Sequence, residues 1–118
     1  TFVVNIRTLS QYHLGEFEEI VLLTVAILDG EAYGVSIITE IEERLRRKVS
    51  LGAIQTVLKR LEDKDLVKSE FGEATNIRGG KRKRLYEITS IGKNILSQAK
   101  EQRNSLWDAI PKVVFKFT

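Results

Sequence analysis

The spacing of apolar residues changes near Asp65, and this change constrains the fold more than any other feature of the chain. Before Asp65, apolar residues recur every three or four positions, which is the period of helices packed on a core. From 67 to 71 two sets of residues alternate, as in a half-buried strand, with Val67, Ser69 and Phe71 on one face. Glycine-bearing residues 74–80 then predict a hairpin tip, and 81–88 predict the returning strand.

Three helices are expected before the hairpin. The first runs from Leu14 to Leu28 and is apolar almost all round, which predicts contacts with its own core and with a partner. The second runs from Ala32 to about Arg47. Ser50 is suited to cap the third helix. That helix is expected to bury Leu51, Ile54, Leu58 and Leu61, and to expose Gln55, Thr56, Lys59 and Asp63.

A long helix is expected after the hairpin, capped by Thr89 or Ser90 and ended near Ile110 by Pro111. Its apolar positions alternate in steps of four and three, which is a heptad-like seam suited to pairing with a second helix. Together with the apolar first helix, this seam predicts a homodimer. The interface is expected to contain Phe17, Val21, Ile95, Ala99, Leu106, Ala109 and Val113.

Helix, helix, helix, strand, strand, helix is the order of a winged helix-turn-helix domain. The expected fold class is therefore mainly α with a two-stranded β wing and a long C-terminal dimerisation helix. Residues 1–88 would form the winged domain that binds DNA, with an N-terminal arm, and 89–118 the dimerisation helix. In such a domain the third helix fits a major groove and the hairpin lies against the neighbouring DNA backbone.

The distribution of charge agrees with binding to a polyanion, although the net charge is only +3. Five cations and no acid lie between 78 and 84, which is the pattern of a phosphate-binding wing. On the third helix, Gln55 is suited to adenine edges, Lys59 to guanine or phosphate, and Thr56 to phosphate or a thymine methyl. The alternative is that these three residues form an ordinary solvated face and that the basic segment only aids solubility.

Several classes of protein are disfavoured by the composition. The 118 residues fit one domain, with no cysteine and a single histidine, His13, so neither a zinc site nor another metal site is expected. No nucleophile with a base is recognisable, so we expect no enzyme and no cofactor. The apolar run of the first helix is too short to cross a bilayer and lacks the basic flank of a secretory signal. A cytoplasmic protein is expected.

Six segments together resemble the PadR family of bacterial winged-helix regulators. They are Leu14–Glu18, Ala32–Val35, Val49–Ile54, Arg60–Glu62, Gly79–Tyr86 and Ile88–Gly92. The resemblance covers roughly 14–96 and implies a homodimer held by the first and last helices. It further implies a repressor that binds a palindromic operator and is released by a small ligand. The short C-terminal part is similar to that of the smaller members.

The third helix, the basic wing and the resemblance together give the expected DNA-contacting residues. They are Tyr33, Gly34, Ser50, Gln55, Thr56, Lys59, Lys81, Arg82, Lys83 and Arg84. Tyr33 and Gly34 would meet a phosphate at the start of the second helix, although Tyr33 could instead pack on the first helix. Gln55 replaces the family's usual tyrosine, which puts the base preference at that position in doubt. Asp65 replaces the family's usual glycine at the end of the third helix, where a left-handed backbone conformation is expected.

A small aromatic effector is also implied, because some small family members stack flat ligands on a tryptophan of the last helix. Trp107 is the sole tryptophan, but Arg103 lies nearer the matching place, and an interface anchor is the alternative for Trp107. The competing function is a winged-helix protein-interaction module without sequence-specific DNA binding. An acidic third helix or an uncharged wing would favour that module, and the sequence has neither.

Overall fold

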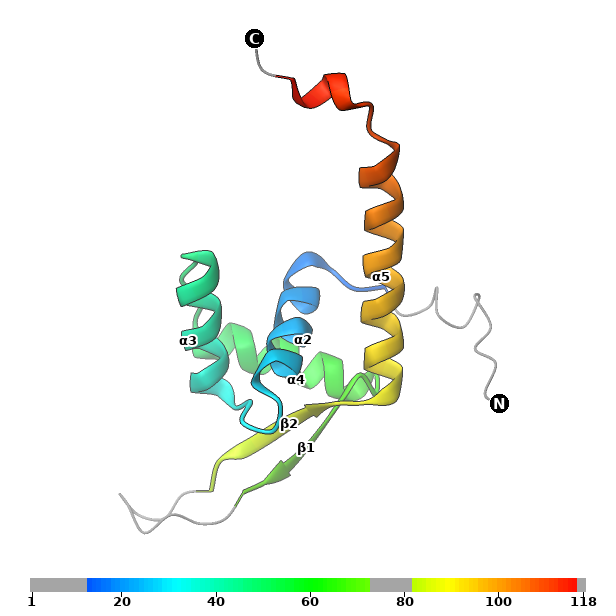
Figure 1. Cartoon of the computed structure of the whole chain (residues 1–118). Helices are drawn as coiled ribbons and strands as arrows, with labels where there is room; N and C mark the ends of the chain where they lie inside the picture. Colours follow the sequence, from blue (N-terminus) through cyan, green and yellow to red (C-terminus); the bar gives the residue numbers. More distant parts are fainter. Residues whose placement is uncertain (1–12, 73–81, 117–118) are drawn as a thin grey trace, which may run out of the picture.

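The computed structural model describes residues 13–72 and 82–116 (Figure 1). The elements follow the expected order of three helices, a hairpin and a long helix. They are α2 (Glu16–Leu28), α3 (Gly34–Leu45), α4 (Leu51–Asp63), β1 (Val67–Phe71), β2 (Arg84–Ile88), α5 (Ser90–Ala109) and the short 3₁₀ helix η1 (Lys112–Phe115). The winged-helix fold class is thereby confirmed. No helix within the described residues is long and apolar enough to cross a membrane.

One core joins the first three helices to the base of the hairpin. The fully enclosed side chains include Leu22, Ile37, Ile41, Ile54, Leu58, Leu61 and Leu66. The two strands are antiparallel, with Val67 opposite Ile88 at the base and Phe71 opposite Arg84 at the outer end. Figure 1 shows α2 between α3 and α5, α4 crossing behind them, and the wing extending below.

The helix ends follow from local chemistry. Ser50 Oγ accepts from the Ala53 N–H at 3.1 Å, and Thr89 Oγ accepts from the Gly92 N–H at 3.0 Å, so both expected caps are confirmed. Asp65 has a φ of 60° and occupies the left-handed position for which the sequence pattern called. The Leu66 N–H donates to the Leu61 carbonyl at 2.9 Å, which closes α4 in a Schellman-type turn.

Three predictions were wrong. Val21 and Ile95 were assigned to a dimer interface, but they are 0% and 4% exposed because the chain's own core encloses them. Leu51, expected to be buried, is 43% exposed because it lies at the edge of the core, over Gly34. Phe71 lies at the outer end of its strand and is 60% exposed.

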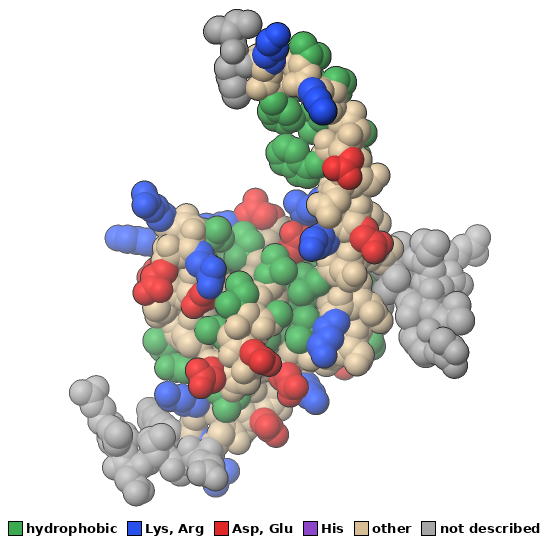
Figure 2. Space-filling model, viewed as in Figure 1, with side chains coloured by type: hydrophobic (Ala, Val, Ile, Leu, Met, Phe, Trp, Pro, Cys, Tyr) green, Lys and Arg blue, Asp and Glu red, His purple; other side chains and the backbone are tan. Residues whose placement is uncertain are grey.

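The last helix leaves the body of the molecule. Gly92 and Ile95 pack into the core, whereas every residue from 101 to 109 is exposed (Figure 1). The helix ends at Ala109, before Pro111, as expected. Figure 2 shows hydrophobic side chains gathered over α2, between α2 and α5, and again along the C-terminal segment. The structure therefore has an apolar face that its own core does not cover.

Candidate functional site

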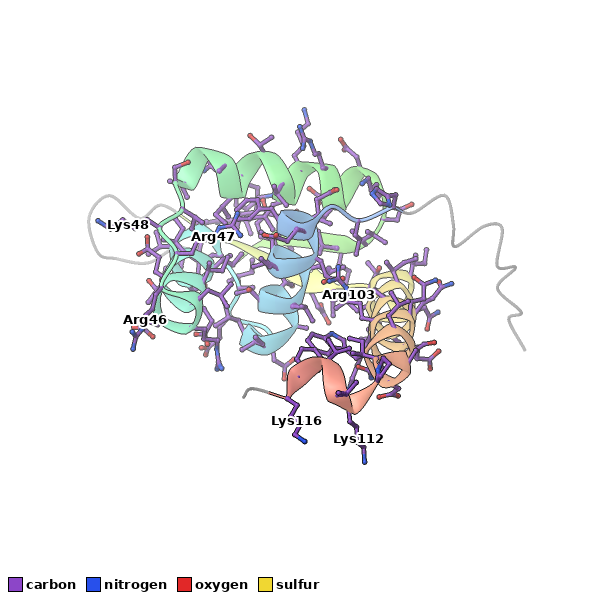
Figure 3. All side chains as sticks on the ribbon, turned by 90° about the horizontal axis from the view of Figure 1, so that it is seen from above. Arg46, Arg47, Lys48, Arg103, Lys112 and Lys116 are labelled. Atoms are coloured by element: carbon purple, nitrogen blue, oxygen red, sulfur yellow. The ribbon has the colours of Figure 1, made fainter. Side chains whose placement is uncertain are left out.

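Helix α4 presents one polar face to solvent. Ile54, Val57, Leu58 and Leu61 anchor its other face in the core. Gln55, Thr56 and Lys59 are exposed, as expected from the sequence. In the view from above, α4 lies along one edge of the molecule with side chains projecting away from it (Figure 3). A helix held in this way has the shape required to enter a major groove.

Two details of this face were not predicted. Arg60, one turn beyond Thr56, is also exposed and adds a cation; the i, i+4 spacing was the available signal. The Thr56 hydroxyl donates to the Gly52 carbonyl at 2.9 Å. Because phosphate oxygens only accept hydrogen bonds, this leaves the Thr56 methyl group as the more available contact, which favours a thymine methyl over a phosphate.

The N-termini of α3 and α4 lie next to each other. A Cβ on Gly34 would stand 2.7 Å from Leu51 Cδ1, so the absence of a side chain at Gly34 allows this close approach. The Tyr33 N–H donates to Ser36 Oγ at 2.9 Å, and Ser50 caps α4 as described above. The partial positive charges of two helix N-termini therefore lie on the same side of the molecule, which suits an anion.

The wing meets the start of α3. The Tyr86 N–H donates to the Ala32 carbonyl at 2.8 Å, and Lys83 Nζ lies 4.4 Å from the centroid of the Tyr33 ring. This cation–π contact brings together two residues that the sequence assigned to DNA. Burial raises the pKa of Tyr86 above its usual value of 10.0, despite the nearby charge of Arg84. Its phenol is therefore neutral at physiological pH.

The arginines of the basic wing segment differ in their contacts. Arg82 is exposed, but Arg84 pairs with Glu62 at 3.2 Å and donates to Ser69 Oγ at 2.9 Å. Arg84 was expected to contact phosphate; its guanidinium is instead engaged within the chain. Lys81 and the tip residues 78–80 lie outside the described residues.

A further basic segment lies in the turn between α3 and α4 and was missed at the sequence level. Arg46 and Lys48 are exposed and point outward, whereas Arg47 points toward α2 (Figure 3). Arg47 pairs with Glu16 at 2.7 Å and lies 5.2 Å above the Phe17 ring. Arg47 therefore holds the turn against α2 and partly covers Phe17.

An open groove of about 510 Å³ separates α2 from α5. It is lined by Glu19, Leu23, Leu96, Ser97, Lys100, Arg103, Asn104 and Trp107. Arg103 pairs with Glu19 at 3.3 Å across the groove. Arg103 and Trp107, the two residues that the sequence assigned to an effector, both line this groove. Trp107 also stacks on Phe115 of η1, with ring centroids 5.8 Å apart and planes inclined by 20°, a contact that the sequence did not reveal.

The remaining interface candidates differ in exposure. Leu106 and Val113 are 71% and 70% exposed, and Ala109 is exposed beside them. Ala99 and Phe17 are half-buried in the single chain. Within the described residues no cluster of three acidic or histidine side chains could hold a metal ion.

Comparisons with known proteins agree on one family. A family model described as the transcriptional regulator PadR-like family matches residues 22–98. An uncharacterised protein from Lysinibacillus sphaericus is 30% identical over 105 residues, which is 87% of this chain and 88% of that protein.

Solved structures show the same architecture. A PadR-like transcription factor from Bacteroides fragilis superposes with a TM-score of 0.68 at 29% identity, over 84% of this chain and 90% of that one. A PadR family transcription regulator from Clostridium difficile gives 0.66 at 26% identity, over 80% and 93%. A transcriptional regulator from Clostridium thermocellum, 24% identical with a TM-score of 0.62, shares the fold over 98% and 99% of the two chains.

Proposed function

Because the chain belongs to the PadR-like family of transcriptional regulators, and is thus a DNA-binding regulator rather than an enzyme, we propose that it represses transcription as a homodimer. In this proposal the dimer binds a palindromic operator and a small ligand releases it. The protein acts in the cytoplasm, where bacterial DNA lies.

The observation that carries the DNA-binding role is the convergence of three positive elements. The N-termini of α3 and α4 adjoin at Gly34 and Leu51, and Lys83 of the wing reaches the ring of Tyr33. In the proposed complex α4 occupies the major groove with Gln55, Thr56 and Lys59 toward base edges. The neighbouring phosphates then meet Tyr33, Gly34, Ser50, Lys81, Arg82 and Lys83.

The uncovered apolar face supports the homodimer. Soluble monomers rarely expose a large contiguous apolar patch, yet Leu106, Val113 and Val114 of the C-terminal segment are each more than half exposed, and Leu23 and Ile27 of α2 nearly so. A second copy would cover them, with Ala99, Ala109 and Phe17 at the margins. The two α4 helices of such a dimer would lie about 34–36 Å apart, one DNA turn.

The groove between α2 and α5 supports the effector. Its volume of about 510 Å³ is in the range of small-molecule sites. A flat ligand in the groove would stack on Trp107 beside Arg103, and Phe115 stacks on the same indole. Since Trp107 is the sole tryptophan, quenching of its fluorescence reports directly on binding at this place.

A salt titration tests the DNA-binding role. Anisotropy of a fluorescein-labelled mixed-sequence duplex should give a dissociation constant that rises steeply with salt. Lys83→Ala should flatten the log–log slope by up to ~2 in a dimer. Lys68→Ala is the matched control, because this second wing lysine pairs with Glu87 at the base of the hairpin. Salt-independent or absent binding by the unmodified protein would refute the role.

A further inference from the structure

Three side chains from α4, β1 and β2 form a closed ring of polar contacts. Ser69 Oγ donates to Glu62 Oε2 at 2.5 Å, Arg84 Nε donates to Ser69 Oγ at 2.9 Å, and Arg84 Nη2 donates to Glu62 Oε1 at 3.2 Å. A hydroxyl has one proton to donate and lone pairs to accept with, so all three contacts are compatible. We call this ring the Glu62 clamp.

The clamp joins α4 to both strands of the wing beyond the base of the hairpin. At the base, the Thr89 N–H donates to the Leu66 carbonyl at 3.0 Å and the Thr89 hydroxyl donates to the Asp65 carbonyl at 2.6 Å. These bonds fix where the hairpin starts. Arg84 belongs to the outermost strand pair, opposite Phe71, and its guanidinium lies 5.5 Å from that ring. The clamp therefore reaches the outer end of the described strands, next to Arg82 and Lys83.

The negative charge of Glu62 is unexpected on a helix that binds DNA. An acid beside a DNA-binding helix repels phosphate, so Glu62 on its own weakens DNA binding. It also occupies Arg84, which would otherwise attract phosphate. A gain must offset both effects if the residue serves DNA binding at all, and the geometry offers one: a fixed angle between α4 and the wing.

We propose that Glu62 is a positioning residue that sets the wing against α4, so that Arg82 and Lys83 reach phosphate while α4 occupies the groove. Arg84 then works through Glu62 and Ser69 rather than by touching DNA. Lys83 and Arg84 are neighbours in sequence with separate partners, the Tyr33 ring and the Glu62 carboxylate, so the start of β2 is joined to the N-terminus of α3 and to α4. This inference rests on the proposed DNA-binding function.

The test compares Glu62→Gln with Glu87→Gln. Gln keeps the size of the side chain and removes its charge in both variants. Glu87 is the matched control, because it lies on the same hairpin and pairs with Lys68 rather than with α4. Binding to the mixed-sequence duplex is measured between ~50 and ~200 mM salt. Stoichiometric titration gives the active fraction, which separates a folding defect from a changed interface.

The clamp predicts a loss where simple electrostatics predicts a gain. Glu62→Gln should bind about fivefold more weakly at low salt and flatten the log–log slope by ~1 or more, because misplaced cations no longer meet phosphate. Glu87→Gln should bind as well as the unmodified protein or better, with the same slope. Ser69→Ala breaks the ring without changing any charge, and it should flatten the slope as well.

The opposite results overturn the clamp. If Glu62→Gln binds as tightly as the unmodified protein or more tightly, with an equal or steeper slope, Glu62 only restrains Arg84. An unchanged slope in Ser69→Ala counts against the clamp in the same way, even where Glu62→Gln folds poorly. Failure of the proposed DNA-binding function gives a different result, because the unmodified protein itself would then show no salt-dependent binding in the same assay.

Discussion

Gly92 marks the closest approach of α5 to the junction between α4 and the wing. A Cβ built on it would lie 2.3 Å from the Leu66 carbonyl oxygen, 3.2 Å from the carbonyl carbon and 2.8 Å from Ile88 Cγ1. Two of these atoms belong to the backbone, which cannot move aside as the end of a side chain can. A single hydrogen atom at position 92 thus allows the last helix to start directly on the base of the hairpin.

We therefore expect Gly92→Ala to destabilise the protein, against the usual preference of helices for alanine. Overpacking of this kind costs about 1–3 kcal/mol. Gly52→Ala is the control, because a Cβ on Gly52, in the first turn of α4, meets nothing within 4 Å. Urea unfolding measures both variants, and a Gly92→Ala protein as stable as Gly52→Ala would show that the Leu66 contact is not restrictive.

Gln55 is the residue at which base readout can be tested. It is exposed on α4 and uncharged, so its loss should cost on the order of 1–3 kcal/mol on the operator and far less on mixed-sequence DNA. Parallel titrations of Gln55→Ala against an operator selected from a random pool and a scrambled duplex measure both costs. Equal losses of affinity on the two DNAs would show that Gln55 contacts the DNA backbone rather than a base edge.

At this scale the sequence predicted local chemistry well and burial less well. Ser50 and Thr89 were identified as caps, and the left-handed position of Asp65 was anticipated, because each depends on a few neighbouring residues. Leu51 and Val21 were misjudged. A helical period shows that a residue is apolar, but whether it faces the chain's own core depends on where distant elements lie.

At the scale of elements, an ion pair ties the start of α2 to the end of α4. Lys64 Nζ lies 2.9 Å from Glu18 Oε2, and the Gly15 N–H donates to Glu18 Oε1 at 3.1 Å. Burial would raise the pKa of Glu18. The hydrogen bonds from Lys64 and Gly15, with the charges of Lys64 and Arg60, outweigh burial and leave that pKa below its usual value of 4.5.

This shift predicts how Glu18 affects stability as the pH changes. A carboxyl whose pKa is lower in the folded state stabilises the fold fully above its unfolded pKa, and this contribution disappears as the pH falls through the folded value. Glu18→Gln should therefore lower the free energy of unfolding at neutral pH, and this difference should disappear as the pH falls through the folded pKa of Glu18, which lies below 4.5. Urea titrations from neutral to acid pH measure the free energy of unfolding. Glu43→Gln is the control, because Glu43 is exposed and its replacement should have little effect. A difference that persists unchanged into acid would contradict the assignment.

The kinds and order of the elements were predictable from the sequence, whereas both ends of α3 were not. The second helix was expected over Ala32–Arg47 and is observed over Gly34–Leu45. Ala32 pairs with Tyr86 of β2 instead, and Arg46 adopts a left-handed conformation with a φ of 51°. The pairing of Ala32 joins residues more than fifty positions apart, and hydrophobic periodicity contains no information about such contacts.

At the scale of the whole molecule, the C-terminal half of α5 extends beyond the body, and the core of the chain does not cover it. Leu106, Trp107, Val113, Val114 and Phe115 are all large, apolar and substantially exposed. The seam was visible in the sequence because heptad spacing is local. The groove between α2 and α5 was not visible in the sequence, because it depends on how these two helices lie in space.

The proposed dimer can be tested at Leu106. In the dimer, Leu106→Asp would place an unpaired carboxylate in an apolar interface, which is strongly unfavourable. We expect monomers or aggregates by sedimentation and loss of operator binding, with weak salt-sensitive binding retained by the intact wing. Asn94→Asp adds the same charge to an exposed position of α5 off the seam and should remain dimeric. A Leu106→Asp protein that sediments as a dimer and keeps its operator affinity would exclude this helix as the interface.

The most direct test of the DNA-binding surface is site-specific crosslinking, which the absence of cysteine from the chain makes clean. A single cysteine carrying a photoactivated aryl azide is introduced as Gln55→Cys on α4, Arg82→Cys on the wing, or Lys112→Cys. Figure 3 shows Lys112 at the opposite edge of the molecule from α4. On a mixed-sequence duplex, the Gln55→Cys and Arg82→Cys proteins should form DNA adducts and the Lys112→Cys protein should not. Equal crosslinking from all three positions, or adducts from Lys112→Cys alone, would contradict the account.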